Sequence, residues 1–163
     1  MKKYIVNNEW IALEQLEEVL VGDFHLELSD SARTAIQKCR TYLDEKVARH
    51  ERLIYGVNTG FGSLCNTAIS NEDLEQLQTN LVLSHACGTG EEVPSELVKR
   101  MIFLKVLGLS HGHSGVQVET VERLIFFFNN NILPVVYQQG SLGASGDLAP
   151  LAHLSVIIIA HLG

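Results

Sequence analysis

Apolar residues recur every three or four positions along most of this 163-residue chain, the spacing that places them on one face of an α-helix. In the stretch after Trp10, Leu13, Leu16 and Leu20 share a face, and Gly22 ends the pattern. Six such segments predict a mainly α-helical fold. The expected helices cover residues 10–21, 29 or 30 to 47, 70–87, 96–107, 116–128 and 147–162.

Polar, glycine-rich stretches separate these segments. Residues 53–66 include the run YGVNTGFGSLCN and predict a loop, with a short strand at Leu53–Tyr55. Gly88 is expected to end the third helix in a left-handed conformation, because glycine adopts that cap without a steric cost. Residues 108–115, which include HGHSG, predict the connection between the fourth and fifth helices.

The composition is that of a globular protein, with 46% hydrophobic and 19% charged residues. The net charge of −7, without a basic stripe, argues against nucleic acid or a membrane surface as a partner. The three cysteines are too widely spaced to indicate a disulfide framework or a structural zinc site. Because the opening residues lack the apolar run of a signal peptide, we expect a cytoplasmic protein.

The most informative chemistry lies in residues 140–147, Gly-Ser-Leu-Gly-Ala-Ser-Gly-Asp. The amide nitrogen of Gly146 can attack the carbonyl carbon of Ala144, and loss of water and of the Ser145 hydroxyl then leaves an exposed methylene group. Glycine suits this role because it lacks a Cβ. Asp147 lies where a carboxylate can assist proton movement. A plainer interpretation is a glycine-rich loop before a buried helix, which can hold a phosphate.

Residues 140–154, GSLGASGDLAPLAHL, resemble the signature of the aromatic amino acid ammonia-lyases. That resemblance implies an all-helical lyase fold. It also implies that Ala144, Ser145 and Gly146 form the electrophile 4-methylideneimidazol-5-one (MIO), with Asp147 supporting it. No metal and no nucleotide are expected as cofactors.

A second motif surrounds Tyr55. A tyrosine beside glycines is usually a packed aromatic at a turn, but YGVNTGFG resembles another hallmark of the same family. The resemblance implies that Tyr55 is the base that removes the β-proton of the substrate, for which the phenol needs hydrogen-bond donors or positive charge nearby. The surrounding positions are expected to form a lid over the substrate. The lid residues are Gly56, Asn58, Gly60 and Gly62.

Ser84 and His85 stand near the end of the third helix. A histidine there is commonly a capping or core residue, but the pair resembles the ring-binding position of the histidine ammonia-lyases. The resemblance implies that both residues bind the substrate and that the reaction converts L-histidine to trans-urocanate and ammonia. A tyrosine ammonia-lyase or 2,3-aminomutase is the alternative within the family, and a non-catalytic helical binding module is the alternative outside it.

The other histidines do not indicate a metal site. His111 and His113 form a pair without a neighbouring carboxylate cluster, and two histidines are too few for a site. His153 and His161 lie in the apolar sixth segment and are interpreted as hydrogen-bonded core residues.

The last predicted helix is apolar nearly all round from Val156 to Leu162, so it needs neighbours on every side. A central position in a small bundle satisfies that need. Members of the resembled family run to roughly three times this length, and we expect residues 1–163 to be one N-terminal domain that stops within a central helical bundle. By the same resemblance, the full-length enzyme is a homotetramer, and this chain alone is expected to be inactive.

Overall fold

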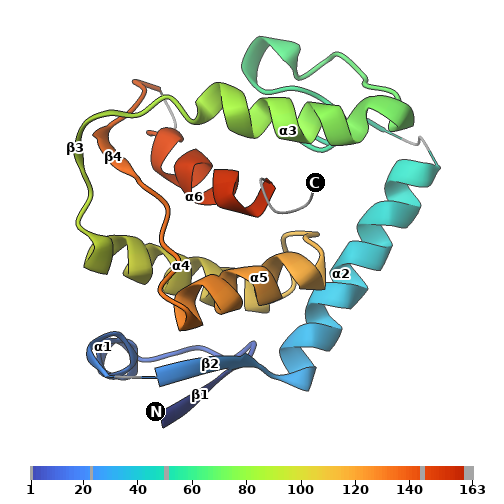
Figure 1. Ribbon diagram of the computed structural model, residues 1–163. Helices are drawn as coiled ribbons and strands as arrows, with labels where there is room; N and C mark the ends of the chain where they lie inside the picture. The colour runs from blue at the N-terminus through green and yellow to red at the C-terminus, as the bar shows by residue number, and fades with distance from the viewer. Residues whose placement is uncertain (1, 23, 50–51, 144–145, 160–163) are drawn as a thin grey trace. The chain divides into compact units, whose positions relative to one another are not determined.

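The computed structural model describes residues 2–22, 24–49, 52–143 and 146–159 (Figure 1). The chain divides into two compact units. Unit 1 comprises Met1–Leu43 and Pro94–Leu133, and unit 2 comprises Asp44–Val93 and Pro134–Gly163. Each unit is described by itself below.

Unit 1 opens with two parallel strands. Strand β1 (Lys2–Val6) pairs with β2 (Phe24–Leu28), in a register that places Lys2 opposite Phe24 and Val6 opposite Leu28. Parallel strands need a crossover connection rather than a tight turn, and helix α1 (Leu13–Val21) lies in that connection. The long helix α2 (Asp30–Ala48) follows, and the Ser29 hydroxyl caps it by accepting the Ala32 N–H at 3.1 Å.

The core of unit 1 lies where helices α4 (Ser95–Ser110) and α5 (Val118–Asn129) pack against each other and against the strands (Figure 1). Phe103 is fully buried, and its ring lies 5.7 Å from the Tyr4 ring and 5.9 Å from the Phe128 ring. The buried apolar side chains of α4 and α5 are Val98, Ile102, Phe103, Val106, Leu109, Val118, Val121, Leu124, Ile125, Phe127 and Phe128.

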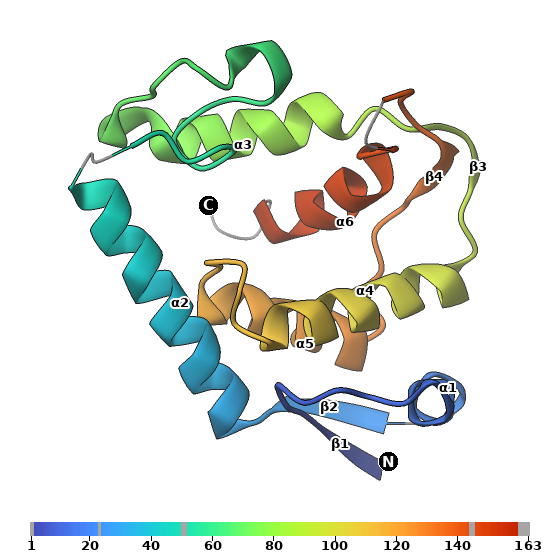
Figure 2. The ribbon, with the colours of Figure 1, turned by 180° about the vertical axis from the view of Figure 1, so that it is seen from behind.

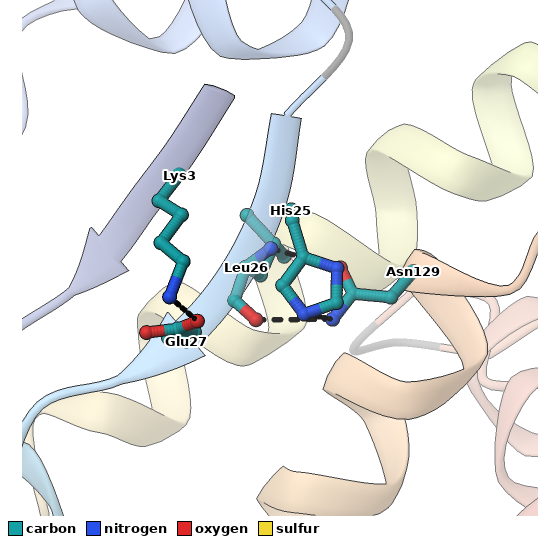
Figure 3. Close-up of polar contacts among 5 residues, drawn as sticks. All are labelled: Lys3, His25, Leu26, Glu27 and Asn129. Carbon is teal, nitrogen blue, oxygen red and sulfur yellow. Dashed lines mark hydrogen bonds and ion pairs between the residues drawn. The ribbon is translucent and has the colours of Figure 1, made fainter. Parts of the chain in front are cut away.

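A side-chain amide takes the place of a strand at the other edge of β2. Figure 3 shows the Asn129 carboxamide facing the backbone of Leu26: its Oδ1 accepts the Leu26 N–H at 2.8 Å, and its Nδ2 donates to the Leu26 carbonyl at 3.0 Å. Asn129 therefore satisfies backbone groups that an edge strand would leave open. On the same strand pair, Lys3 donates to Glu27 at 2.6 Å, and this hydrogen bond lowers the pKa of the Glu27 carboxyl.

Unit 2 is built on helix α3 (Leu74–His85), which packs against helix α6 (Ala149–Ile159). The two helices lie side by side in Figure 1 and in the opposite view of Figure 2. Two short antiparallel strands, β3 (Thr89–Glu92) and β4 (Tyr137–Gln139), lead from α3 and towards α6. The loop before α3 contains two 3₁₀ turns, Gly62–Leu64 and Asn71–Asp73.

The structure confirms the mainly α-helical fold and all six predicted helices, with shifted ends. Helix α1 begins three residues late, α4 extends to Ser110, and α6 begins at Ala149. Two local predictions are wrong. Leu53–Tyr55 forms no strand, because its backbone enters a turn that Asn58 organises. Gly88 is not left-handed; α3 already ends at His85.

None of the helices in the described residues is long and apolar enough to cross a membrane. The division into two units does not test the prediction of one N-terminal domain, which stays a prediction.

Candidate active site

Tyr55 lies in the loop of unit 2 that precedes α3. Its side chain is 61% exposed, and its hydroxyl oxygen accepts the Gly62 N–H at 3.2 Å. A backbone N–H aimed at this oxygen is a donor of the kind that a phenolate needs. The ring also lies 5.4 Å from the Phe61 ring, at an interplanar angle of 39°. Tyr55 is thus oriented by a hydrogen bond and a ring contact, with little burial.

Asn58 organises the loop from within. It is buried, its Oδ1 accepts the Ile54 N–H at 2.6 Å, and its Nδ2 donates to the Arg52 carbonyl at 3.3 Å. The neighbouring Thr59 is fully buried, and its hydroxyl accepts the Gly56 N–H at 3.2 Å. Asn58, which the sequence assigned to a lid, therefore stabilises the loop through hydrogen bonds within it.

Local backbone conformation and packing explain why glycine occupies three positions of the loop. Gly56 and Gly62 have φ angles of +69° and +57°, which side chains of other residues disfavour. At Gly56 a Cβ would also lie 2.5 Å from the Phe61 ring, and at Gly60 it would lie 2.7 Å from the Cβ of Leu64. The glycines permit tight packing around Phe61 and Leu64. The mobile lid stays a prediction.

His85 ends helix α3 with a defined hydrogen-bonding state. Its Nδ1 lies 2.7 Å from the Leu81 carbonyl oxygen, and a carbonyl can only accept, so Nδ1 carries a proton. In the neutral ring, Nε2 is then left as an acceptor. The ring also meets Phe61 edge to face, with 5.4 Å between centroids. The Ser84 hydroxyl donates to the same Leu81 carbonyl at 3.0 Å.

Of the triad predicted to form the electrophile, the structure describes Gly146; Ala144 and Ser145 lie outside the described residues. Gly146 has a φ of +103°, and its N–H donates to the Gly143 carbonyl at 3.2 Å. Only glycine adopts such a φ without strain.

Asp147 clamps the loop that carries the triad. Its Oδ1 accepts the N–H of Ser141 at 2.9 Å and the N–H of Ala149 at 3.0 Å. These two backbone hydrogen bonds are the main cause that lowers the pKa of the Asp147 carboxyl. A side chain at Gly140 would collide with the same carboxylate. Asp147 therefore connects Ser141 to Ala149 through its carboxylate. Helix α6 begins at Ala149, two residues after Asp147.

A cavity of about 380 Å³ brings two of the predicted site residues of unit 2, Tyr55 and His85, together; Gly146, Asp147 and the predicted lid residues are not among those that line it. Its wall is mostly apolar, with a few polar side chains, as is usual for a small-molecule site. Tyr55 and His85 both line it, as does the first part of α6; Ser84 does not. The lining residues are Tyr55, Phe61, Gln78, Leu81, Val82, His85, Leu148, Leu151, Ala152 and Ser155.

Of the residues that line this cavity, the sequence predicted only Tyr55 and His85 as site residues; Gln78 and Phe61 are two of those that it missed. Phe61 lies inside the YGVNTGFG motif, so its position next to Tyr55 was a usable signal. Gln78 carried none, because a glutamine on the polar side of a helix is ordinary. Its Nε2 donates to the carbonyls of Gly56 at 2.9 Å and Val57 at 3.1 Å.

Among the remaining histidines that the structure describes, His153 has defined contacts. His153 accepts the Gly88 N–H at 2.9 Å and lies edge to face with Tyr137, which confirms the prediction of a hydrogen-bonded residue. His161 lies outside the described residues. His111 and His113 are exposed. Within the described ranges, no group of three or more histidine, cysteine or acidic side chains could hold a metal ion.

Comparisons with known proteins show what this chain is similar to. Histidine ammonia-lyase from Deinococcus radiodurans is 50% identical over 147 residues, which cover 90% of this chain and 28% of that protein. The crystal structure of histidine ammonia-lyase from Trypanosoma cruzi superposes with a TM-score of 0.80 at 34% identity, over 96% of this chain and 29% of the other.

A third relative is an ergothioneine-degrading enzyme, ergothionase, from Treponema denticola. Its structure gives a TM-score of 0.89 at 25% identity and covers 97% of this chain and 31% of that one. The chain therefore spans less than a third of the length of these relatives. The sequence model of the aromatic amino acid lyases matches residues 11–162. The chain belongs to the aromatic amino acid lyase family.

Proposed function

We propose that this chain supplies the electrophile, the catalytic tyrosine and a ring-binding histidine of a cytoplasmic ammonia-lyase that converts L-histidine to trans-urocanate. The observation that carries the proposal is the shared cavity: Tyr55 from the loop, His85 from α3 and the first turns of α6 line one space of about 380 Å³. Deprotonation of an amino acid with a polar ring needs a base, here Tyr55, close to a group that hydrogen-bonds to the ring, here His85.

The described flanks of the triad fit formation of the MIO group. Gly146 adopts a φ of +103°, and the space where a Cβ would stand is open. Gly143 receives its N–H, and Asp147 holds both sides of the loop through Ser141 and Ala149. When formed from Ala144, Ser145 and Gly146, the group supplies an electrophile that protein side chains lack.

Tyr55 is the proposed general base. Tyr55 lines the cavity, and its hydroxyl accepts the Gly62 N–H, so a phenolate at this oxygen keeps a hydrogen-bond donor. Its exposed edge leaves room for the proton of a substrate carbon to approach. General base catalysis by such a residue contributes roughly 10²–10⁴-fold to a rate.

His85 is the proposed reader of the substrate ring. Because Leu81 fixes the proton on Nδ1, the neutral ring presents Nε2 as an acceptor, and the N–H of an imidazole is a matching donor. A site built for such a hydrogen bond discriminates against rings without the donor. Ser84 takes part only indirectly in this proposal, because its hydroxyl is bound to the same Leu81 carbonyl.

The groups that hold the substrate carboxylate are proposed to come from residues outside this chain, and the active assembly is proposed to be a homotetramer. The chain's short span of its relatives supports the first point, and the second follows from the family resemblance alone. We therefore expect activity in the full-length protein and none in residues 1–163 alone.

The test uses the full-length protein and its Ser145→Ala variant as the matched control. Mass spectrometry of the peptide that contains residues 140–149 should show the loss of two waters in the unsubstituted protein and none in the variant. Incubation with L-histidine should release trans-urocanate and ammonia only from the unsubstituted protein. An unchanged peptide mass, or preferential turnover of tyrosine, would contradict the proposal; the latter would indicate a tyrosine lyase or 2,3-aminomutase.

A further inference from the structure

We propose that Gln78 is the positioning residue for Tyr55, and this inference rests on the proposed role of Tyr55 as the base. Gln78 stands on α3 and lines the same cavity as Tyr55. Its Nε2 donates to the carbonyl oxygens of Gly56 at 2.9 Å and Val57 at 3.1 Å, the two residues that directly follow Tyr55. The helix is thereby tied to the backbone beside the base.

The two hydrogen bonds are chemically compatible. A carboxamide nitrogen carries two protons, so one Nε2 can donate to two carbonyls at once. The reverse orientation of the amide would direct its oxygen at two other oxygens and is excluded by repulsion. The partners therefore fix which way the Gln78 amide points, and a side chain of the same length without a donor cannot replace it.

The hydrogen bonds within the loop set its shape but do not anchor it to α3; the Phe61 ring also contacts α3, because it meets the His85 ring edge to face with 5.4 Å between centroids. Asn58 bonds to Ile54 and Arg52, and Gly62 bonds to Tyr55, so these contacts all begin and end in residues 52–62. Gln78 is more than twenty positions farther along the chain. Its bonds fix where the folded loop lies relative to the helix that carries His85.

Tyr55 depends on such a tie because burial does not hold it. The side chain is 61% exposed, and its ring contacts Phe61, a residue of the same loop. A displacement of the loop therefore carries the Tyr55 and Phe61 rings together, and the edge-to-face contact between Phe61 and His85 is lost with it. A base misplaced by about 1 Å can lose roughly a hundredfold in rate.

The experiment replaces Gln78 in the full-length protein with Met, which removes the donors, and with Lys, which restores donors on an unbranched chain. These residues have similar helix propensities, so α3 itself is preserved. Gln76→Met is the matched control, because Gln76 lies on the same helix and bonds to Asn80, outside the loop. Hydrogen exchange of residues 52–62 and steady-state kinetics are measured for each variant.

We expect Gln78→Met to raise exchange in residues 52–62 by about tenfold, the equivalent of losing roughly one hydrogen bond. It should lower kcat by about ten- to a hundredfold while KM changes by less than about twofold. Gln78→Lys should recover most of both losses, and Gln76→Met should show neither. Exchange in α3 and α6 serves as the internal check that the variants are folded.

Several results would overturn the proposal. Unchanged exchange in Gln78→Met would mean that the glutamine does not hold the loop. Raised exchange with an unchanged kcat, or a Lys variant as impaired as the Met variant, would mean that its donors do not position the base. A complete lack of turnover in the unsubstituted protein would instead refute the proposed function, and exchange in residues 52–62 would still decide whether Gln78 anchors the loop.

Discussion

Unit 1 and unit 2 use different forces to hold their parts. In unit 1, α4 and α5 bury six side chains each, including Phe103 and Phe127. In unit 2, α3 buries none fully, and α6 buries only Ala149, Ala152 and Leu154. The site-bearing unit relies instead on single polar contacts from side chain to backbone. The difference separates stability from function: a dense core tolerates little change, whereas an open cavity leaves its polar groups available to a ligand.

The largest expected effect concerns Phe103, the centre of the unit 1 core. Phe103→Ala should reduce the free energy of unfolding by about 3–5 kcal/mol, because it removes buried area and leaves a void. The control is Phe126→Ala, on α5 with its side chain 55% exposed, for which a loss below about 1 kcal/mol is expected. Denaturant unfolding of the full-length protein measures both. Equal losses would show that burial of Phe103 in the core of unit 1 does not stabilise the fold.

Tyr55 tests the opposite property in unit 2. Tyr55→Phe keeps the ring against Phe61 and removes only the hydroxyl, so the melting temperature should hardly change. The kcat on L-histidine should fall by about 10²–10⁴-fold, because the base is lost. Steady-state kinetics beside a thermal melt separates the two effects. A variant with full activity would exclude Tyr55 as the base.

His85 should affect which substrate is used more than how fast the best one reacts. His85→Leu removes the acceptor that Leu81 leaves at Nε2, so the imidazole N–H of a bound substrate loses its partner. We expect kcat/KM for L-histidine to fall by roughly ten- to a hundredfold, the range for a buried group left unpaired. Turnover of tyrosine should fall less. Equal losses for both substrates would show that His85 does not read the ring.

The smallest expected effect is the pH response of the Asp147 clamp. The pKa of this carboxyl is lowered by the Ser141 and Ala149 N–H groups, so the clamp favours the closed loop above the ordinary aspartate value of 3.8. That contribution is lost as the pH falls through the lowered value. Hydrogen exchange of residues 141–149, corrected for the intrinsic effect of pH, should therefore rise only in acid.

Asp147→Asn should remove that pH dependence, because the amide oxygen does not titrate in this range. Asp30→Asn is the control, since Asp30 is also an aspartate near the start of a helix, in the first turn of α2, and belongs to unit 1. A pH response that persists in the Asp147 variant would assign it to another group.

The sequence predicted the helices because their signal is local. The spacing of apolar residues indicated all six, and Ser29 and Gly22 marked helix ends that the structure has. The ends that shifted depend on contacts from elsewhere. Helix α6 begins at Ala149 because the carboxylate of Asp147 accepts the Ala149 N–H and is shared with Ser141 across the loop.

The strands were not predicted, because their pairing also depends on residues far apart in the chain. Strand β3 reads Thr-Gly-Glu-Glu, which has no strand pattern, and it forms because β4 pairs with it from a distant part of the chain. Strands β1 and β2 pair in parallel across α1, a contact that no short window of sequence contains. Gly88, predicted as a left-handed cap, instead approaches the His153 ring, which lies on α6.

The sequence by itself determined the chemistry that is available. The order Ala144-Ser145-Gly146, the tyrosine beside glycines and the histidine near a helix end are present in the sequence itself, and the spacing of apolar residues predicted the helix that carries the histidine. Only the tertiary structure decided that Tyr55, His85 and the first turns of α6 border one cavity, and that Gln78 holds the loop beside the base. The physical reason is that packing of α3 on α6 joins residues far apart in the chain, and local patterns carry no record of such distances.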